Sequence, residues 1–268
     1  MALEPHPLNR DFTWRPPASQ PAFLSHEQVR QFDEEGYFLI ERAFSPQEID
    51  AVTAAIDPFE AKAEAFLRRQ EGGRLFIARA DEITFTVFLV TRSRVCADFS
   101  RHPVFAGVCG DLIGPAARLY HDQAVYKKPG AAQEFPWHQD NGYAFLDPQQ
   151  YVTCWVALSD ATLNNGCPWV KPRVHRMGTL AHTSTDLGFQ CLTPPVEGAI
   201  AVPAAKGDIV VFSSLTPHRT GPNLTDAPRK SYILQYAPDA ARVRKTADDP
   251  GALQQDPLRQ YRIVADDR

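Results

Sequence analysis

The chain lacks the features that mark membrane, nucleic-acid-binding and secreted proteins. Among its 268 residues, no apolar run approaches the ~18 residues that a transmembrane helix requires. The net charge is −4 and no block of basic residues occurs, which argues against a face that reads nucleic-acid phosphates. The N-terminus has no basic start followed by an apolar stretch, so no signal peptide is predicted.

Cysteine is scarce and shows no pairing pattern. No Cys-x-x-Cys occurs, and the odd number argues against a disulfide framework and against a structural zinc site. The five cysteines are widely spread: Cys96, Cys109, Cys154, Cys167 and Cys191. Buried free thiols in a reducing compartment are the simpler explanation. We therefore expect a cytoplasmic protein with no nucleic-acid or membrane partner, and no particular oligomeric state is predicted.

Proline and capping residues organise the first part of the chain. Residues 1–22 contain five prolines and are predicted to form an extended arm, followed by a single domain over residues 23–268. Ser25-His-Glu-Gln28 and Ser45-Pro-Gln-Glu48 are capping boxes, and each predicts the start of a helix. We expect these helices to pack against the outside of a sheet.

From about residue 75 the patterning becomes that of strands. Turn signals such as Lys128-Pro-Gly130 and Asn164-Asn-Gly166 separate short apolar segments, and no βαβ rhythm appears. The predicted strands are Leu75–Ala78, Ile83–Leu89, Ala117–Tyr126, Tyr151–Leu158, Ala199–Val202, Ile209–Phe212 and Tyr232–Tyr236. Many short strands with flanking helices indicate a mainly β fold, either a sandwich or a jelly roll.

Three residues could together bind a metal ion. His138 and Asp140 are two positions apart, and side chains at i and i+2 of a strand point to the same face. His218 follows the apolar run Asp208–Ser213 and could complete a 2-His-1-carboxylate set, which suits non-haem Fe(II). The His-x-Asp spacing alone is weak support, since it is common by chance. Ordinary core or surface histidines are the alternative.

Taken together, these segments resemble the phytanoyl-CoA dioxygenase family of Fe(II)/2-oxoglutarate-dependent oxygenases. The likeness covers most of the chain, in five places: Leu24–Tyr37, Trp137–Asp140, Cys154-Trp155, Asn164–Arg176, and His218 with Arg229. One departure is Arg173-Val174, where the family usually has Gly-Ser before the histidine. The resemblance implies a double-stranded β-helix, a cupin-like jelly roll, which agrees with the strand pattern.

The resemblance also implies a reaction. His138, Asp140 and His218 would bind Fe(II), with 2-oxoglutarate and O2 as cosubstrates. The implied chemistry is hydroxylation of an unactivated C–H bond of a small metabolite or secondary-metabolite intermediate, with release of succinate and CO2. Asp140 keeps the carboxylate that related halogenases replace with a small residue, so hydroxylation is favoured over halogenation. Desaturation, epoxidation or cyclisation by the same iron chemistry stay open, as does a non-catalytic jelly-roll binding module.

Further residues receive roles from the same resemblance. Arg229 would bind the distal carboxylate of 2-oxoglutarate, because a guanidinium matches a carboxylate bidentately. Thr220, Gln123 and Trp155 fall where the family contacts this cosubstrate. The segment Gly178–Pro195 is weakly patterned and is expected to be a functional loop or lid.

The remaining polar residues divide into substrate candidates and structural ones. The candidates for substrate contacts are Asn141, Tyr143, Phe145 and, for an anionic substrate, Arg74 and Arg79. His175 belongs to a structural turn in the family. His121 has no partner by pattern, so both histidines are predicted to be structural or exposed.

Overall fold

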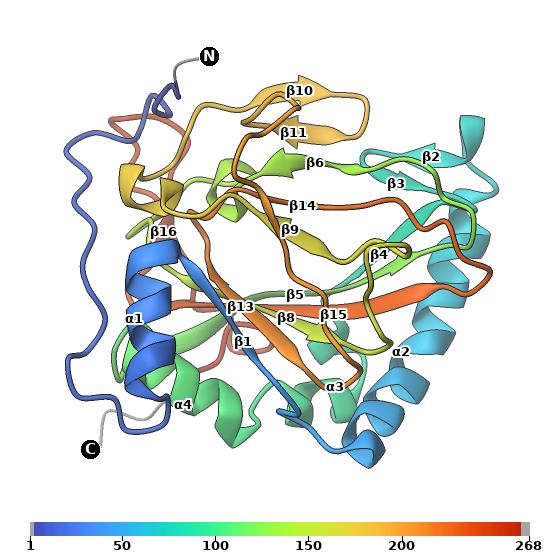
Figure 1. Ribbon diagram of the computed structural model, residues 1–268, viewed down its shortest axis with the longest axis horizontal. Coiled ribbons are helices and arrows are strands. Elements are labelled where there is room, and N and C mark those ends of the chain that lie inside the picture. The colour runs from blue at the N-terminus through green and yellow to red at the C-terminus, as the bar shows by residue number, and fades with distance from the viewer. Residues whose placement is uncertain (1–2, 264–268) are drawn as a thin grey trace.

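Two antiparallel sheets lie face to face in the computed structural model, which describes residues 3–263 (Figure 1). The larger sheet contains, in spatial order, β1 (Tyr37–Ile40), β13 (Ile209–Ser213), β8 (Val152–Ala157), β15 (Arg229–Pro238), β5 (Ala117–Lys127), β4 (Ile83–Val87), β3 (Ala78–Arg79) and β2 (Arg74–Leu75). The smaller sheet contains β12 (Ile200–Ala201), β9 (Pro168–Val170), β14 (His218–Thr220) and β6 (Phe135–His138). This is the predicted jelly roll, mainly β with flanking helices.

Short elements complete the described chain. One two-stranded sheet pairs β10 (Thr183–Thr185) with β11 (Gly188–Gln190). A three-stranded sheet has the order β17 (Ala252–Leu253), β16 (Arg242–Val243) and β7 (Leu146–Asp147). Single 3-10 turns are Glu71–Gly73, Leu89–Thr91, Asp140–Gly142 and Val174–Met177. The helices are α1 (His26–Glu35), α2 (Pro46–Leu67), α3 (Arg94–Phe99) and α4 (Pro103–Leu112).

Both predicted capping boxes are present. Ser25 and Ser45 each accept a hydrogen bond from the backbone three residues on, and the glutamine or glutamate there reaches back to the cap. Helix α1 ends where Gly36 takes φ +85°, a conformation that most residues avoid. Helices α3 and α4 were not predicted; Ser93 and His102 cap them with side-chain hydrogen bonds but without a capping box.

Strand alternation separates two cores. On β8, Cys154 and Val156 belong to the cluster that the strands form with the helices. Trp155 and Ala157 belong to the second cluster, which the two sheets form between them. Because both faces of β8 are covered, all six of its residues are buried. The face that carries Trp155 is the one on which a site between the sheets must lie.

One expectation about strands needs correction. Leu75–Ala78 is not one strand but the turn of a hairpin between β2 and β3, since Phe76 takes φ +52° and reverses the chain. The segment Gly178–Pro195, expected to be a functional loop or lid, contains the β10–β11 hairpin in its middle.

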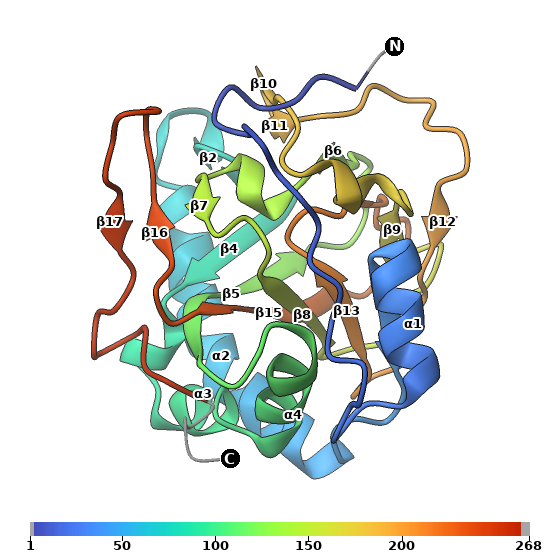
Figure 2. The ribbon, with the colours of Figure 1, turned by 90° about the vertical axis from the view of Figure 1, so that its left-hand side faces the viewer.

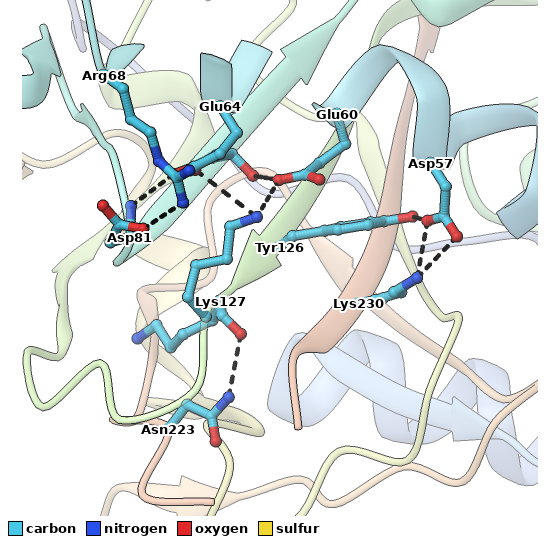
Figure 3. A network of polar contacts seen from close by, with 11 residues as sticks. Asp57, Glu60, Glu64, Arg68, Asp81, Tyr126, Lys127, Asn223 and Lys230 are labelled. Carbon is cyan, nitrogen blue, oxygen red and sulfur yellow. Dashed lines mark hydrogen bonds and ion pairs between the residues drawn. The ribbon is translucent and has the colours of Figure 1, made fainter. Parts of the chain in front are cut away.

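Acidic groups of α2 fix this helix on the outer side of the larger sheet (Figure 3). Asp57 accepts hydrogen bonds from the Tyr126 hydroxyl, 2.7 Å, and from the Lys230 amine, 2.8 Å. Glu60 accepts a hydrogen bond from Lys128. Tyr126 lies on β5, Lys128 directly follows β5, and Lys230 lies on β15. The helix therefore holds together two strands whose opposite faces look toward the second sheet.

The N-terminal arm, residues 3–22, crosses one side of the molecule in an extended form before it enters α1 (Figure 2). The Asn9 side-chain amide donates to the carbonyls of Met177 and Thr179, both at 2.9 Å. The Trp14 indole donates to Asp33 at 2.6 Å. The arm therefore braces the segment that follows the Val174–Met177 turn.

Candidate metal centre and cosubstrate pocket

His138, Asp140 and His218 come together between the two sheets. Strand β14 pairs with β6 so that His218 lies opposite His138. One ligand atom from each of the three residues lies within 4.8 Å of the others. The Nε2 atoms of His138 and His218 are 3.9 Å and 3.7 Å from Asp140 Oδ1. The arrangement suits one metal ion bound by two imidazoles and a carboxylate, with open positions.

The local backbone differs from the expected strand. Strand β6 ends at His138, and Asp140 is the first residue of a 3-10 turn. Gln139 between them keeps extended angles, φ −105° and ψ 143°, so the two flanking side chains still face the same way. The Gln139 amide in turn bonds the carbonyl of Leu215 and the backbone N–H of Leu180, both at 2.6 Å. These bonds fix the link between the two metal-ligand candidates.

Both histidines present the same nitrogen to the centre. His138 Nδ1 donates to the Pro136 carbonyl at 2.8 Å, and His218 Nδ1 donates to the Thr216 carbonyl at 3.0 Å. A carbonyl can only accept, so each Nε2 keeps its lone pair for a metal. Burial lowers the pKa of His138 to about 3 and of His218 to about 4, so both rings are neutral at pH 7.

Asp140 is oriented by groups that sequence reasoning missed. Its Oδ2 accepts a hydrogen bond from the Thr153 hydroxyl. Burial raises the pKa of Asp140, while the neighbouring His138 and hydrogen bonds from Thr153 and Gln235 act in the opposite direction. A buried carboxylate beside two neutral imidazoles lacks a positive partner, which a divalent cation would supply.

Arg229 is a buried cation without an anion. It is completely buried on β15, and burial lowers its pKa to about 10, so it stays charged at pH 7. Its Nη1 donates to the Ser231 hydroxyl at 2.7 Å, whereas Nε and Nη2 have no partner among the described residues. The guanidinium lies 5.3 Å from the centre of the Trp155 ring. Two unpaired donors on a planar guanidinium are what a carboxylate would satisfy.

One cavity of about 520 Å³ joins these groups. It is lined by all the residues predicted for the metal and the cosubstrate: His138, Asp140, His218, Arg229, Gln123, Trp155 and Thr220. The smaller sheet supplies the histidines and Thr220, and the larger sheet supplies Arg229, Gln123 and Trp155. Residues that are distant in sequence are therefore grouped as the resemblance implied.

Only some of the candidates for substrate contacts line the cavity. Tyr143 lines the cavity. Asn141 is instead buried in a structural role, with its amide bonded to Thr179 at 2.7 Å. Phe145 lies outside the cavity and stacks on His6.

The two candidate arginines also lie outside the described cavity lining. Arg79 donates to the carbonyl of Asp186, and Arg74 is exposed on β2. His175, predicted to be structural or exposed, is buried, and its Nε2 donates to the carbonyl of Asp33 at 3.0 Å.

The prediction for His121 is wrong, because this residue lines the cavity beside Tyr120. A bulge explains how two successive residues face inward. Gln235 pairs with His121 and Tyr236 pairs with Leu119, which leaves Tyr120 without a partner. Alternation from Gln123 could have identified His121, and alternation from Trp155 could have identified Thr153. The bulge has no sequence signal of its own.

Comparison with known proteins agrees with this site. A family model described as Phytanoyl-CoA dioxygenase (PhyH) matches residues 32–231. Phytanoyl-CoA dioxygenase 1 of Oryza sativa subsp. japonica is 26% identical over 255 residues, which cover 82% of this chain and 90% of the rice protein.

Solved structures give the same result for the fold. The carbocyclase SnoK from nogalamycin biosynthesis superimposes with a TM-score of 0.74 at 24% identity, covering 89% of this chain and 98% of SnoK. EctD from S. alaskensis, solved with 2-oxoglutarate and 5-hydroxyectoine, superimposes with a TM-score of 0.67 at 23% identity. The match covers 92% of this chain and 86% of EctD.

The chain belongs to the phytanoyl-CoA dioxygenase family. It is thus an enzyme of the Fe(II)/2-oxoglutarate oxygenase class, with iron as its metal, 2-oxoglutarate as cosubstrate and O2 as the usual co-substrate of the family. No helix within residues 3–263 combines the length and apolar character needed to cross a membrane.

Proposed function

We propose that this enzyme hydroxylates an unactivated C–H bond of a small metabolite or secondary-metabolite intermediate. The observation that carries the proposal is the pairing, in one cavity, of a His-Asp-His cluster with a buried arginine that lacks an anion. Bound iron, with 2-oxoglutarate and O2, supplies the oxidising power, and 2-oxoglutarate leaves as succinate and CO2.

The protein's part begins with the metal. We assign His138, Asp140 and His218 as its ligands, each held by a partner that fixes its orientation. The carbonyls of Pro136 and Thr216 keep both Nε2 atoms unprotonated, so no proton has to leave the rings before the metal binds. Two neutral rings and one carboxylate leave a site of net charge +1 when Fe(II) is bound, which favours an anionic cosubstrate.

The cosubstrate would be oriented by the larger sheet. Arg229 would bind the distal carboxylate of 2-oxoglutarate through Nε and Nη2, the two atoms that have no protein partner. Gln123 and Trp155 lie on the neighbouring strands, opposite the same residue of β15, and Thr220 faces them from β14. We propose that these side chains close around the keto acid and exclude water from it.

Hydroxylation is proposed rather than halogenation because of Asp140. Its carboxylate occupies the third ligand position, so that position is not left for a halide. Desaturation, epoxidation and cyclisation use the same ligands and are distinguished by the product. We also propose a cytoplasmic setting and one catalytic domain over residues 23–268; all five cysteines are free, which suits a reducing compartment.

The test measures succinate from purified protein supplied with Fe(II), 2-oxoglutarate and O2. Wild type is expected to form succinate, and Asp140→Ala is expected to lose both this activity and tight metal binding. Asp147→Ala is the matched control, because Asp147 is an exposed carboxylate nearby that pairs with Arg244. Undiminished succinate release by Asp140→Ala would refute the ligand assignment. With a substrate in hand, the gain of one oxygen atom in the product separates hydroxylation from desaturation.

A further inference from the structure

The wall of the cavity beyond the cosubstrate site is almost free of charge. Apart from Asp140 and Arg229, no lining residue within the described chain is an aspartate, glutamate, lysine or arginine. Phe85 and Val87 of β4 and Phe135 of β6 line it instead. Once 2-oxoglutarate occupies the metal and Arg229, a second anion placed here would find no unpaired cation among the lining residues. Burying an ion without a partner is strongly unfavourable.

The rim of the cavity is apolar as well. Leu75 and Phe76, at the turn of the β2–β3 hairpin, line it although 55% and 66% of their surface is exposed. Phe76 holds φ +52°, a strained conformation for a bulky residue, and its ring lies 6.2 Å from that of Phe189 on β11. Exposed apolar side chains at the entrance of a cavity favour contact with an apolar ligand.

One polar group of the cavity lining, the Tyr120 hydroxyl, has no hydrogen-bond partner among the described residues. The β5 bulge turns the Tyr120 side chain into the cavity, next to His121. The Tyr120 ring packs against Tyr151 at 5.5 Å, but its hydroxyl makes no hydrogen bond to any described residue. A ligand with an oxygen beside Tyr120 would satisfy the hydroxyl, since tyrosine hydroxyls that are shielded from bulk water usually have a partner.

We propose that the primary substrate is an uncharged, predominantly apolar molecule with a hydroxyl or carbonyl group that bonds to Tyr120. This inference rests on the proposed function, because it assumes that Arg229 is taken by 2-oxoglutarate. The cations near the cavity do not offer a site for an anion inside. Arg79 is engaged by the Asp186 carbonyl, Arg259 near Tyr120 pairs with Asp256, and Arg74 does not line the cavity. An acyl chain with its charged head outside, at Arg74, is the competing arrangement.

The test is equilibrium dialysis with the protein loaded with Fe(II) and 2-oxoglutarate in the absence of O2. The probes are 2-naphthol, 2-naphthyl phosphate, naphthalene and decanoyl-CoA. We expect 2-naphthol to bind at least about ten-fold more tightly than either charged probe. Tyr120→Phe should weaken 2-naphthol about five-fold and leave naphthalene unchanged, because only the former loses a hydrogen bond.

The matched control is Tyr261→Phe, which removes a hydroxyl that bonds Ser100 away from the cavity. Binding of 2-naphthyl phosphate or decanoyl-CoA as tightly as 2-naphthol would overturn the proposal, and so would a lack of saturable binding by both neutral probes. Dialysis of 2-oxoglutarate itself, together with succinate release, reports separately on the proposed function. A failed preference among the probes is therefore distinguishable from a failed assignment of the cosubstrate.

Discussion

Replacing Arg229 by methionine should have opposite effects on the stability of the protein and on its affinity for 2-oxoglutarate. In the free protein the guanidinium is completely buried, and its Nε and Nη2 have no described partner. Each unsatisfied buried donor costs about 1–3 kcal/mol, and an apolar side chain of similar length has no such cost. We expect the free energy of unfolding of Arg229→Met, without ligand, to exceed that of wild type by about 1–3 kcal/mol.

The cosubstrate reverses this order. A charge-assisted, bidentate contact to the distal carboxylate is worth about 2–4 kcal/mol after desolvation is considered. At about 1.4 kcal/mol per factor of ten, the Kd of 2-oxoglutarate should rise about 30- to 700-fold in the variant. Because a ligand stabilises the state that it binds, saturating 2-oxoglutarate should stabilise wild type and have little effect on Arg229→Met.

Urea unfolding with and without 2-oxoglutarate measures both effects in one experiment. Arg118→Met is the control, because Arg118 on β5 is a largely buried arginine whose guanidinium already pairs with Asp239 and donates to the Gln260 carbonyl. It should lose stability in the free protein and keep its response to 2-oxoglutarate. The reasoning about Arg229 is refuted if its variant is less stable than wild type without ligand and equally stabilised by 2-oxoglutarate.

Three further predictions concern the metal site and the buried His175. Thr153→Val removes the hydroxyl bonded to Asp140 and should weaken metal binding about ten-fold, as measured by competition with a chelator; unchanged affinity would contradict the assigned role. Mn(II), a redox-stable substitute, should raise the Tm of wild type and leave that of Asp140→Ala unchanged, and equal shifts would locate the metal elsewhere. Burial lowers the pKa of His175 to about 4. Between about pH 6.5 and pH 4 the unfolded chain therefore binds a proton that the folded chain does not, and the free energy of unfolding falls as the pH falls. His175→Gln, measured by unfolding from pH 7 to pH 4.5, should reduce this slope by about 1.4 kcal/mol per pH unit, and an unchanged slope would show that His175 is not involved.

Local chemistry explains which elements the sequence could predict. The helices at Ser25 and Ser45 were predictable because a capping box is a short-range signal. Helices α3 and α4 lack that box and are 6 and 10 residues long, so their sequences alone carry little periodicity. The β2–β3 turn was missed because apolar residues occupy it where turns usually contain Gly, Asn or Asp.

The residues of the candidate site also differ in how far the sequence could predict them. Resemblance to a family identified His218 and Arg229, and the structure brings both to one cavity. It could not identify Tyr120, because the bulge that turns this residue inward depends on how β5 aligns with β15. Such a register is a tertiary property. His121 was misjudged for a simpler reason: its i,i+2 relation to Gln123 was not followed along the strand.

The facing positions of His138 and His218 on β6 and β14 have a consequence for folding. These strands are far apart in the chain, so their pairing closes a large loop and is expected to come late, after contacts that are local in sequence. A chain that has collapsed but has not paired β14 with β6 would contain both histidines without holding them together. Metal uptake during refolding would then report on the completion of the smaller sheet rather than on collapse. An apoenzyme that gains its native helices before it can bind metal would display that order directly.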